Sequence, residues 1–96
     1  MRRTQTVSVG DILKEFFERP HVAAKLAEGH LPQYWREVVG EYGHNNTLEL
    51  RLERGILHVR VSSAVLRQEL LFRRDYIAAE LNKRAGRQLV NAIVIR

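Results

Sequence analysis

The chain has 96 residues, of which 45% are hydrophobic and 28% charged, a composition typical of one small globular domain. The absence of cysteine excludes disulfides, thiolate metal sites and cysteine nucleophiles. No apolar run reaches the roughly 18 residues of a membrane span, and no apolar block follows the basic N-terminus as in a secretory signal. We therefore expect a soluble cytoplasmic protein, with residues 1–7 as a flexible basic tail and residues 8–96 as a single domain.

The first forty residues predict three short helices. Ser8 has the chemistry of an N-cap for the first helix, and Pro20 ends that helix and starts the second. The second ends at Gly29, and the third extends over residues 32–39 and ends at Gly40. Hydrophobic and aromatic side chains recur on one face of each helix, so we expect them to hold the three helices together.

The hydrophobic period changes from 3.6 to 2 after a turn-rich stretch at residues 43–46. Residues 48–53 and 57–62 alternate apolar with polar side chains, and Arg54-Gly55 between them has the chemistry of a two-residue turn. This pattern predicts an antiparallel hairpin with one buried face. The residues expected on that face are Leu48, Leu50, Leu52, Leu57, Val59 and Val61.

A second helical block and a last strand complete the predicted fold. Ser62 or Ser63 caps the block, which extends from Ala64 to about Arg84 and closes at Gly86. Residues 89–96 are apolar and β-branched, so they are expected to join the sheet of the hairpin. The predicted fold class is α+β, a three-stranded sheet with helices packed on one face.

No pattern in the sequence indicates a catalytic or metal site. The four histidines lack metal-ligand spacing, and no phosphate-binding or dinucleotide-binding fingerprint is present. His58 falls on the polar face of a strand and is expected to be an ordinary surface residue. Trp35 shares a helix face with two valines, so we expect it in the core rather than as a platform for base stacking. We therefore expect neither enzymatic activity nor a cofactor or small-molecule substrate.

The net charge of +5 is confined to the second half of the chain. Residues 1–48 hold six Lys/Arg and six acidic residues, whereas residues 49–96 hold ten and five. A basic half-domain is typical of a protein that binds a polyanion, although a charge of this size also suits a merely soluble surface. The candidate nucleic-acid contacts are Arg67, Arg73, Arg74, Lys83, Arg84 and Arg87, with Arg2, Arg3, Arg51 and Arg60 as possible helpers.

Spacing along the helical block separates these cations into two groups. Glu69 and Arg73, and Glu80 and Arg84, have the i,i+4 spacing of helical ion pairs. The other four, Arg67, Arg74, Lys83 and Arg87, have no acid four residues before them and are the freer cations for phosphate.

A Gly-x-x-Gly pattern at residues 40–43 matches the loop with which KH domains clamp a nucleic-acid backbone. It carries Glu41, which would repel phosphate, and it precedes a strand instead of joining two helices. We interpret Gly40 as a helix C-cap instead.

Several segments, taken in order, resemble the DciA family. They are Tyr34–Gly40 (YWREVVG), Gly55–Ala64 (GILHVRVSSA), Leu66–Leu70 (LRQEL) and Leu81–Gly86 (LNKRAG). The resemblance extends over about residues 6–96. It implies a KH-like fold of the type II order α-β-β-α-α-β, and a non-catalytic, DNA-binding accessory role with the bacterial replicative helicase, without naming individual contact residues. Larger members of the family carry an additional tail linked to helicase contact.

The KH-like order also predicts where Arg73 lies. By helical spacing alone, Arg73 would fall on the buried face of the helical block. That order requires two helices, so we expect a break at residues 72–75, with Asp75 capping the second helix and Arg73 projecting from the junction. Two alternative functions stay open: an RNA- or ribosome-associated KH-like protein, and a pure protein-interaction domain.

Overall fold

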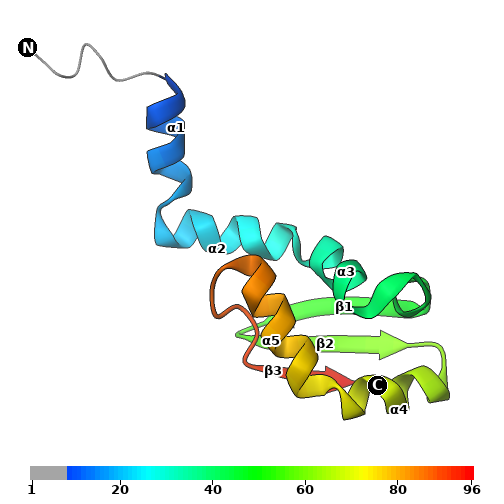
Figure 1. Cartoon of the computed structure of the whole chain (residues 1–96). Helices are drawn as coiled ribbons and strands as arrows, with labels where there is room; N and C mark the ends of the chain where they lie inside the picture. Colours follow the sequence, from blue (N-terminus) through cyan, green and yellow to red (C-terminus); the bar gives the residue numbers. More distant parts are fainter. Residues whose placement is uncertain (1–8) are drawn as a thin grey trace, which may run out of the picture.

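The computed structural model describes residues 9–96, and in this part of the chain helices and strands alternate in blocks (Figure 1). The elements are α1 Val9–Phe17, α2 Pro20–Gly29, α3 Leu31–Asn45, β1 Thr47–Glu53, β2 Ile56–Val61, α4 Ala64–Phe72, α5 Arg74–Ala85 and β3 Ala92–Ile95. The strands form one mixed sheet in the order β1-β2-β3, in which β1 and β2 are antiparallel and β2 and β3 parallel. The predicted α+β class and three-stranded sheet are confirmed.

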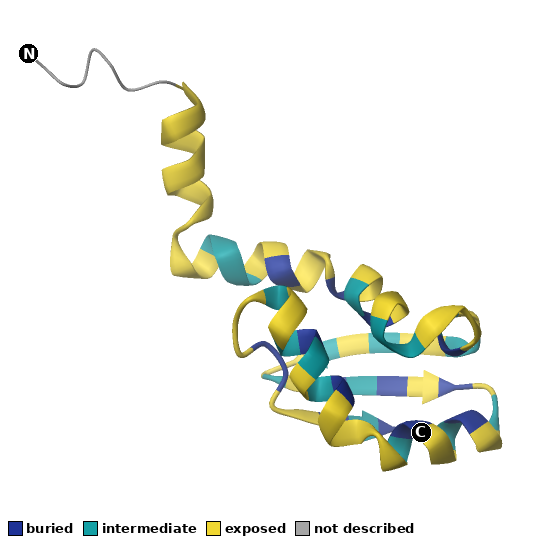
Figure 2. Ribbon diagram, in the orientation of Figure 1, coloured by how far each residue is buried: buried dark blue, intermediate teal, exposed yellow. Residues whose placement is uncertain are grey.

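Helices α3, α4 and α5 cover one face of the sheet and enclose the core. Alternation along β2 and β3 points Leu57, Val59 and Ile93 into this core, where each is at most 4% exposed. Trp35 of α3 is completely buried, as the sequence predicted. Figure 2 shows the buried residues concentrated where the helices face the strands. The opposite face of the sheet has no helix over it among the described elements.

The hairpin forms as predicted, except at the start of β1. Arg54 and Gly55 both have positive φ, 51° and 81°, which suits a tight turn between twisted antiparallel strands. Leu48 was expected on the buried face, but it is 55% exposed. The pairing register shifts between Thr47 and Glu49. This irregularity turns the Leu48 side chain away from the buried face of the sheet.

Helix α3 continues past the predicted stop at Gly40, although its backbone breaks there. Gly40 has φ 84° and ψ 176°, and a further helical stretch follows up to Asn45. The prediction of a turn at residues 43–46 was therefore wrong. Gly43 packs so closely on Val39 that an added Cβ would lie 2.8 Å from its Cγ2 atom. Both glycines thus have structural roles in α3: Gly40 takes the positive φ at the kink, while the C-cap of the whole helix is Asn46 and not Gly40.

The predicted break at residues 72–75 is confirmed. Arg73 separates α4 from α5 with φ −104° and ψ 11°, and its side chain is exposed. The prediction that Asp75 caps the second helix was wrong, because the capping residue is Arg73 and Asp75 lies within the first turn. At the other end of α4, Ser63 is the cap, and its Oγ accepts a hydrogen bond from the Leu66 amide at 3.2 Å.

Helix α1 contributes nothing to the core. All of its residues are exposed, including Ile12, Phe16 and Phe17, and Figure 1 shows it standing away from the rest of the molecule. The radius of gyration is 17.2 Å, above the roughly 12 Å expected for a compact chain of this length. The expectation that apolar side chains hold the first three helices together was therefore wrong for α1. The predicted cap Ser8 and the tail at residues 1–7 lie outside the described residues.

Deleting residues 1–17 should change the free energy of unfolding of the domain by less than about 1 kcal/mol. The reason is that no residue of α1 is buried, so its loss removes almost no burial of apolar surface. Urea denaturation followed by circular dichroism compares the shortened and full chains. A loss of several kcal/mol would show that α1 packs on the domain in solution.

Candidate nucleic-acid interface

The described residues contain no arrangement that suggests a metal site or a membrane span. No group of three His, Asp or Glu residues within residues 9–96 is placed to hold a metal ion. None of the helices in that range is long and apolar enough to cross a bilayer. The candidate site residues are the charged side chains in the second half of the chain, which carries the net charge of +5.

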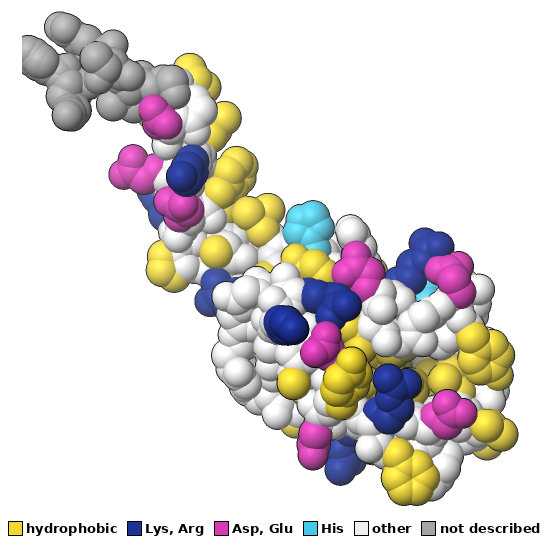
Figure 3. All heavy atoms as spheres, viewed as in Figure 1, with side chains coloured by type: hydrophobic (Ala, Val, Ile, Leu, Met, Phe, Trp, Pro, Cys, Tyr) yellow, Lys and Arg dark blue, Asp and Glu magenta, His cyan; other side chains and the backbone are white. Residues whose placement is uncertain are grey.

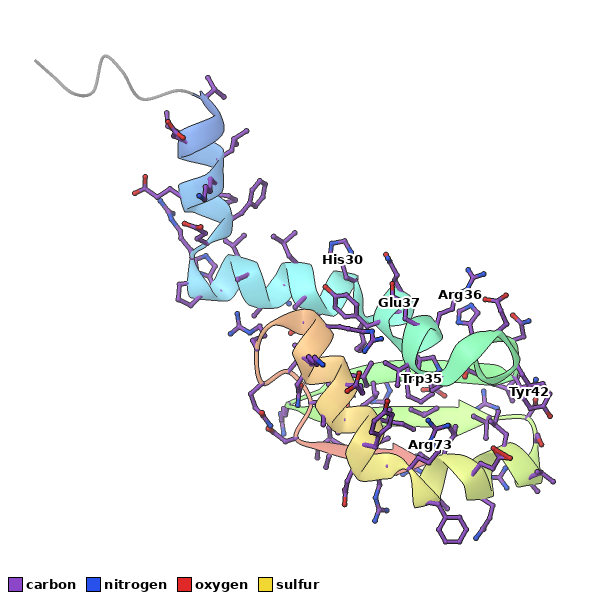
Figure 4. The ribbon with its side chains drawn as sticks, in the orientation of Figure 1. His30, Trp35, Arg36, Glu37, Tyr42 and Arg73 are labelled. Carbon is purple, nitrogen blue, oxygen red and sulfur yellow. The ribbon has the colours of Figure 1, made fainter. Side chains whose placement is uncertain are left out.

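Arg84, near the end of α5, is held by two carboxylates. Its Nη1 lies 2.7 Å from Glu80 on the same helix, and its Nε lies 3.2 Å from Glu37 on α3. The first of these is the predicted i,i+4 pair. The hydrogen bonds that Arg84 donates to Glu80 and to Glu37 raise the pKa of its guanidinium above the usual value. Arg84 thus links α5 to Glu37 of α3, which is labelled in Figure 4. Phosphate would have to displace two carboxylates to reach Arg84.

Of the six predicted cations, only Arg84 is paired with a carboxylate of the described residues. No carboxylate of residues 9–96 lies within 4.0 Å of Arg67, Arg74 or Lys83. Arg74, at the start of α5, lines a hollow between this helix and β3, and Lys83 lies on the side of α5 away from the buried Leu81. Arg67 is half-buried beside the core residue Leu66. These cations are therefore available to an anion.

Arg73 projects from the junction, as the predicted break requires. The alternative that its spacing offered, an ion pair with Glu69, is not formed, since within the described chain no carboxylate lies within 4.0 Å of Arg73. Its guanidinium carbon instead lies 5.5 Å from the centroid of the Tyr76 ring, a cation–π contact between the junction and the first turn of α5. Figure 4 shows Arg73 at the meeting point of α4 and α5. An exposed cation therefore lies at this junction, on an aromatic ring.

Arg87 follows α5 and helps to join the C-terminal part of the fold to α2. Its Nη1 donates a hydrogen bond to the Pro20 carbonyl oxygen at 3.3 Å. This contact uses only one of its five donor hydrogens, so the side chain keeps its charge for a ligand. Arg2 and Arg3, two of the possible helpers, lie outside the described residues.

The other two helpers, Arg51 and Arg60, lie on the open face of the sheet beside acidic residues. Arg51 pairs with Glu53 at 2.5 Å and with Glu49 at 3.3 Å, and Arg60 pairs with Glu49 at 3.4 Å. Hydrogen bonds from Arg60 and then Arg51 lower the pKa of the Glu49 carboxyl. The charges on this face are largely matched within the sheet.

His58 occupies the same open face and is less exposed than the sequence suggested. Its side chain is 22% exposed, and its Nδ1 is buried without a hydrogen-bond partner. Its Nε2 lies 3.9 Å from Glu53, which is beyond hydrogen-bonding distance. His58 lines the same small hollow as Arg51 and Arg60, and among the described residues it belongs to no group of metal ligands.

The sequence interpretation missed two exposed aromatic residues beside the predicted arginines. Phe72 is 80% exposed at the end of α4, and Tyr76 is 54% exposed in the first turn of α5. The signal was available, because neither position shares the helical phase of the core residues Leu70, Ile77 and Leu81. Figure 3 shows basic, hydrophobic and acidic side chains intermixed over α4 and α5. The candidate surface is therefore an aromatic and basic helix junction and not a continuous basic patch.

Comparison with known proteins gives one match. The family model described as "Dna[CI] antecedent, DciA" matches residues 8–95, which is nearly the whole chain. No curated protein and no solved structure matches the chain.

Proposed function

Because this chain belongs to the DciA family, we propose that it is a non-catalytic accessory protein of the bacterial replicative helicase that binds DNA in the cytoplasm. Family membership supports a general role in helicase loading during replication. We further propose that residues 8–96 form one domain of KH-like type II order. The order α3-β1-β2-α4-α5-β3 and the mixed sheet are compatible with that assignment.

One observation carries the DNA-binding part of the proposal. Arg73, Arg74 and Lys83 are exposed, and none has a carboxylate of residues 9–96 within 4.0 Å. Cations that are not neutralised within the protein release counterions when they meet phosphate, and this release drives sequence-independent binding to nucleic acid. The proposed contacts also include Arg67, Arg84 and Arg87, with Arg84 contributing least because two carboxylates already hold it.

Fluorescence anisotropy with labelled oligonucleotides tests the proposal directly. We expect binding to single-stranded and forked DNA at about 50 mM salt, and a steep loss of affinity by about 200 mM salt. A matched RNA oligomer that binds more tightly would favour an RNA-associated protein instead. No binding to any nucleic acid would leave a protein-interaction domain, in which the basic half contacts an acidic partner. A pull-down with the replicative helicase of the same organism tests the partner separately.

The double variant R74Q/K83Q should weaken DNA binding roughly tenfold at about 100 mM salt. On single strands, the slope of log affinity against log salt should become shallower by roughly 0.7 for each phosphate that the variant no longer neutralises. Anisotropy titrations at several salt concentrations measure both quantities. Neither side chain makes an ion pair that stabilises the fold, so the variant should keep its melting temperature.

The double variant R51Q/R60Q is the matched control, since it removes the same charge from the open face of the sheet. Both arginines are already paired with Glu49 or Glu53, so the affinity should change by less than about threefold. An equal loss in both variants would mean that net charge alone governs binding. A larger loss in the control would move the interface to the sheet.

A further inference from the structure

We propose that the α4–α5 junction binds single-stranded DNA by stacking bases on Phe72 and Tyr76 while Arg73 and Arg74 contact the phosphates. This inference rests on the proposed DNA-binding function. It adds a preference for unpaired bases and names the residues that produce it.

The exposure of the two aromatic rings is the first observation. Phe72 is 80% exposed and Tyr76 54% exposed, whereas the core of the same two helices is filled by Leu66, Leu70 and Ile77, each at most 5% exposed. The fold does not need either ring, because they contribute little burial. A single exposed apolar residue is ordinary, but two exposed aromatic side chains four positions apart, one on each side of a helix junction, leave ring surface open to a ligand.

The charges around the rings identify the chemistry of the ligand. Arg73 lies 5.5 Å from the centre of the Tyr76 ring, and Arg74 follows it at the start of α5. Asp75 follows the two arginines and Glu69 lies one helical turn before Arg73. No carboxylate of residues 9–96 lies within 4.0 Å of either guanidinium, so both remain available to an anion. Aromatic rings beside guanidinium groups suit a ligand with flat apolar faces and regularly spaced negative charges.

Unpaired nucleotides meet this description and duplex DNA does not. The bases of a duplex are stacked on each other, so their faces are closed to a side chain, and only the phosphates and the base edges in the grooves remain accessible. In a single strand each base presents a free face, and stacking on an aromatic ring is tolerant of sequence. The break at Arg73 supports this arrangement, because it lets the end of α4 and the start of α5 present their side chains at one exposed corner.

Alanine variants of the two aromatics separate stacking from electrostatics. With a labelled oligo-dT strand, F72A and Y76A should each lose about tenfold in affinity, which corresponds to the usual contribution of one stacked base. Binding to a duplex of equal length should change by less than about twofold. The salt slope should stay the same for both ligands, because no cation is removed. Both positions are exposed, so circular dichroism should show the fold unchanged.

Two further variants complete the test. Y42A removes an equally exposed aromatic from the far part of α3, 64% exposed and distant from Arg73 in Figure 4, and should bind as the unmodified chain does. F72W keeps an aromatic face and should retain the affinity, and its indole emission should be quenched by oligo-dT while the buried Trp35 stays unaffected.

The outcomes distinguish this inference from the function on which it rests. If the unmodified chain binds oligo-dT and F72A/Y76A binds it equally well, stacking is wrong and electrostatic DNA binding stands. Equal losses on single strands and duplex would also overturn stacking. If the unmodified chain binds no DNA at low salt, both proposals fail.

Discussion

Replacing Trp35 by alanine is expected to lower the free energy of unfolding by about 3–5 kcal/mol, a large part of the stability of a small domain. Trp35 is completely buried between α3 and the sheet (Figure 4), and its Nε1 donates a hydrogen bond to the Thr47 Oγ1 at 2.9 Å. Alanine would leave a cavity that the surrounding core cannot fill. Urea denaturation followed by far-ultraviolet circular dichroism measures the loss without using tryptophan emission.

Two milder variants divide the contribution of Trp35 into packing and hydrogen bonding. T47V leaves the ring in place but removes the acceptor for Nε1 and the hydroxyl that donates to the Gly43 carbonyl oxygen at 2.7 Å. It should cost about 1–3 kcal/mol, since buried polar groups lose their partners. W35F keeps most of the apolar volume and should fall between T47V and W35A. If W35A were as stable as the unmodified chain, the position of α3 over the sheet would be wrong.

Replacing Asn82 by alanine is expected to cost about 3–4 kcal/mol because one side chain satisfies three backbone groups. Its Oδ1 accepts from the amides of Leu89 at 2.8 Å and Val90 at 2.7 Å, and its Nδ2 donates to the Val90 carbonyl oxygen at 2.8 Å. Leu89 and Val90 are both buried, so water cannot replace the lost partner easily. Chemical denaturation of the purified variant measures the loss.

Gln88 supplies a matched control in the same loop. Its Nε2 donates to the Val90 carbonyl oxygen at 3.4 Å and to Asn91 at 3.0 Å, and the residue is exposed. Q88A should therefore cost less than about 1 kcal/mol. N82D should lie between the two alanine variants, because it keeps the acceptor for both amides and loses only the donor. Equal effects of N82A and Q88A would contradict the bridging role of Asn82.

The elements of the fold follow from local chemistry in the sequence, but several boundaries do not. Alternation and the Arg54-Gly55 turn predicted the hairpin, and Gly86 closes α5 as expected, with φ 72°. The predicted last strand began at residue 89, whereas β3 begins at Ala92. The amides of residues 89 and 90 bond to Asn82 instead of a strand, and a partner from an earlier helix cannot be inferred from the apolar character of the segment.

Tertiary context also explains why the arrangement of the site could not be predicted. The sequence identified the basic half and the break at Arg73, but helical spacing could not show that Glu37, distant in the chain, would pair with Arg84. Spacing also offered an ion pair between Glu69 and Arg73 as an alternative, and that pair is not formed in the described chain, where Arg73 lies over the Tyr76 ring instead. The burial of a helix face depends on whether a neighbour covers it, and for α1 none of the described elements does.

Because β2 and β3 are parallel, the helices of the proposed interface can reach their final positions only when the third strand joins the sheet. Parallel neighbours need a crossover connection, and here α4 and α5 are that connection, since Ile56 pairs with Ala92 across them. The β1–β2 hairpin closes locally, whereas the third strand can dock only after a long loop has been ordered. We therefore expect the helices that carry Phe72 and the arginines to reach their final positions in the slowest part of folding. A strand of DNA bound there would hold the crossover closed, and so would stabilise the part of the molecule that is expected to form last.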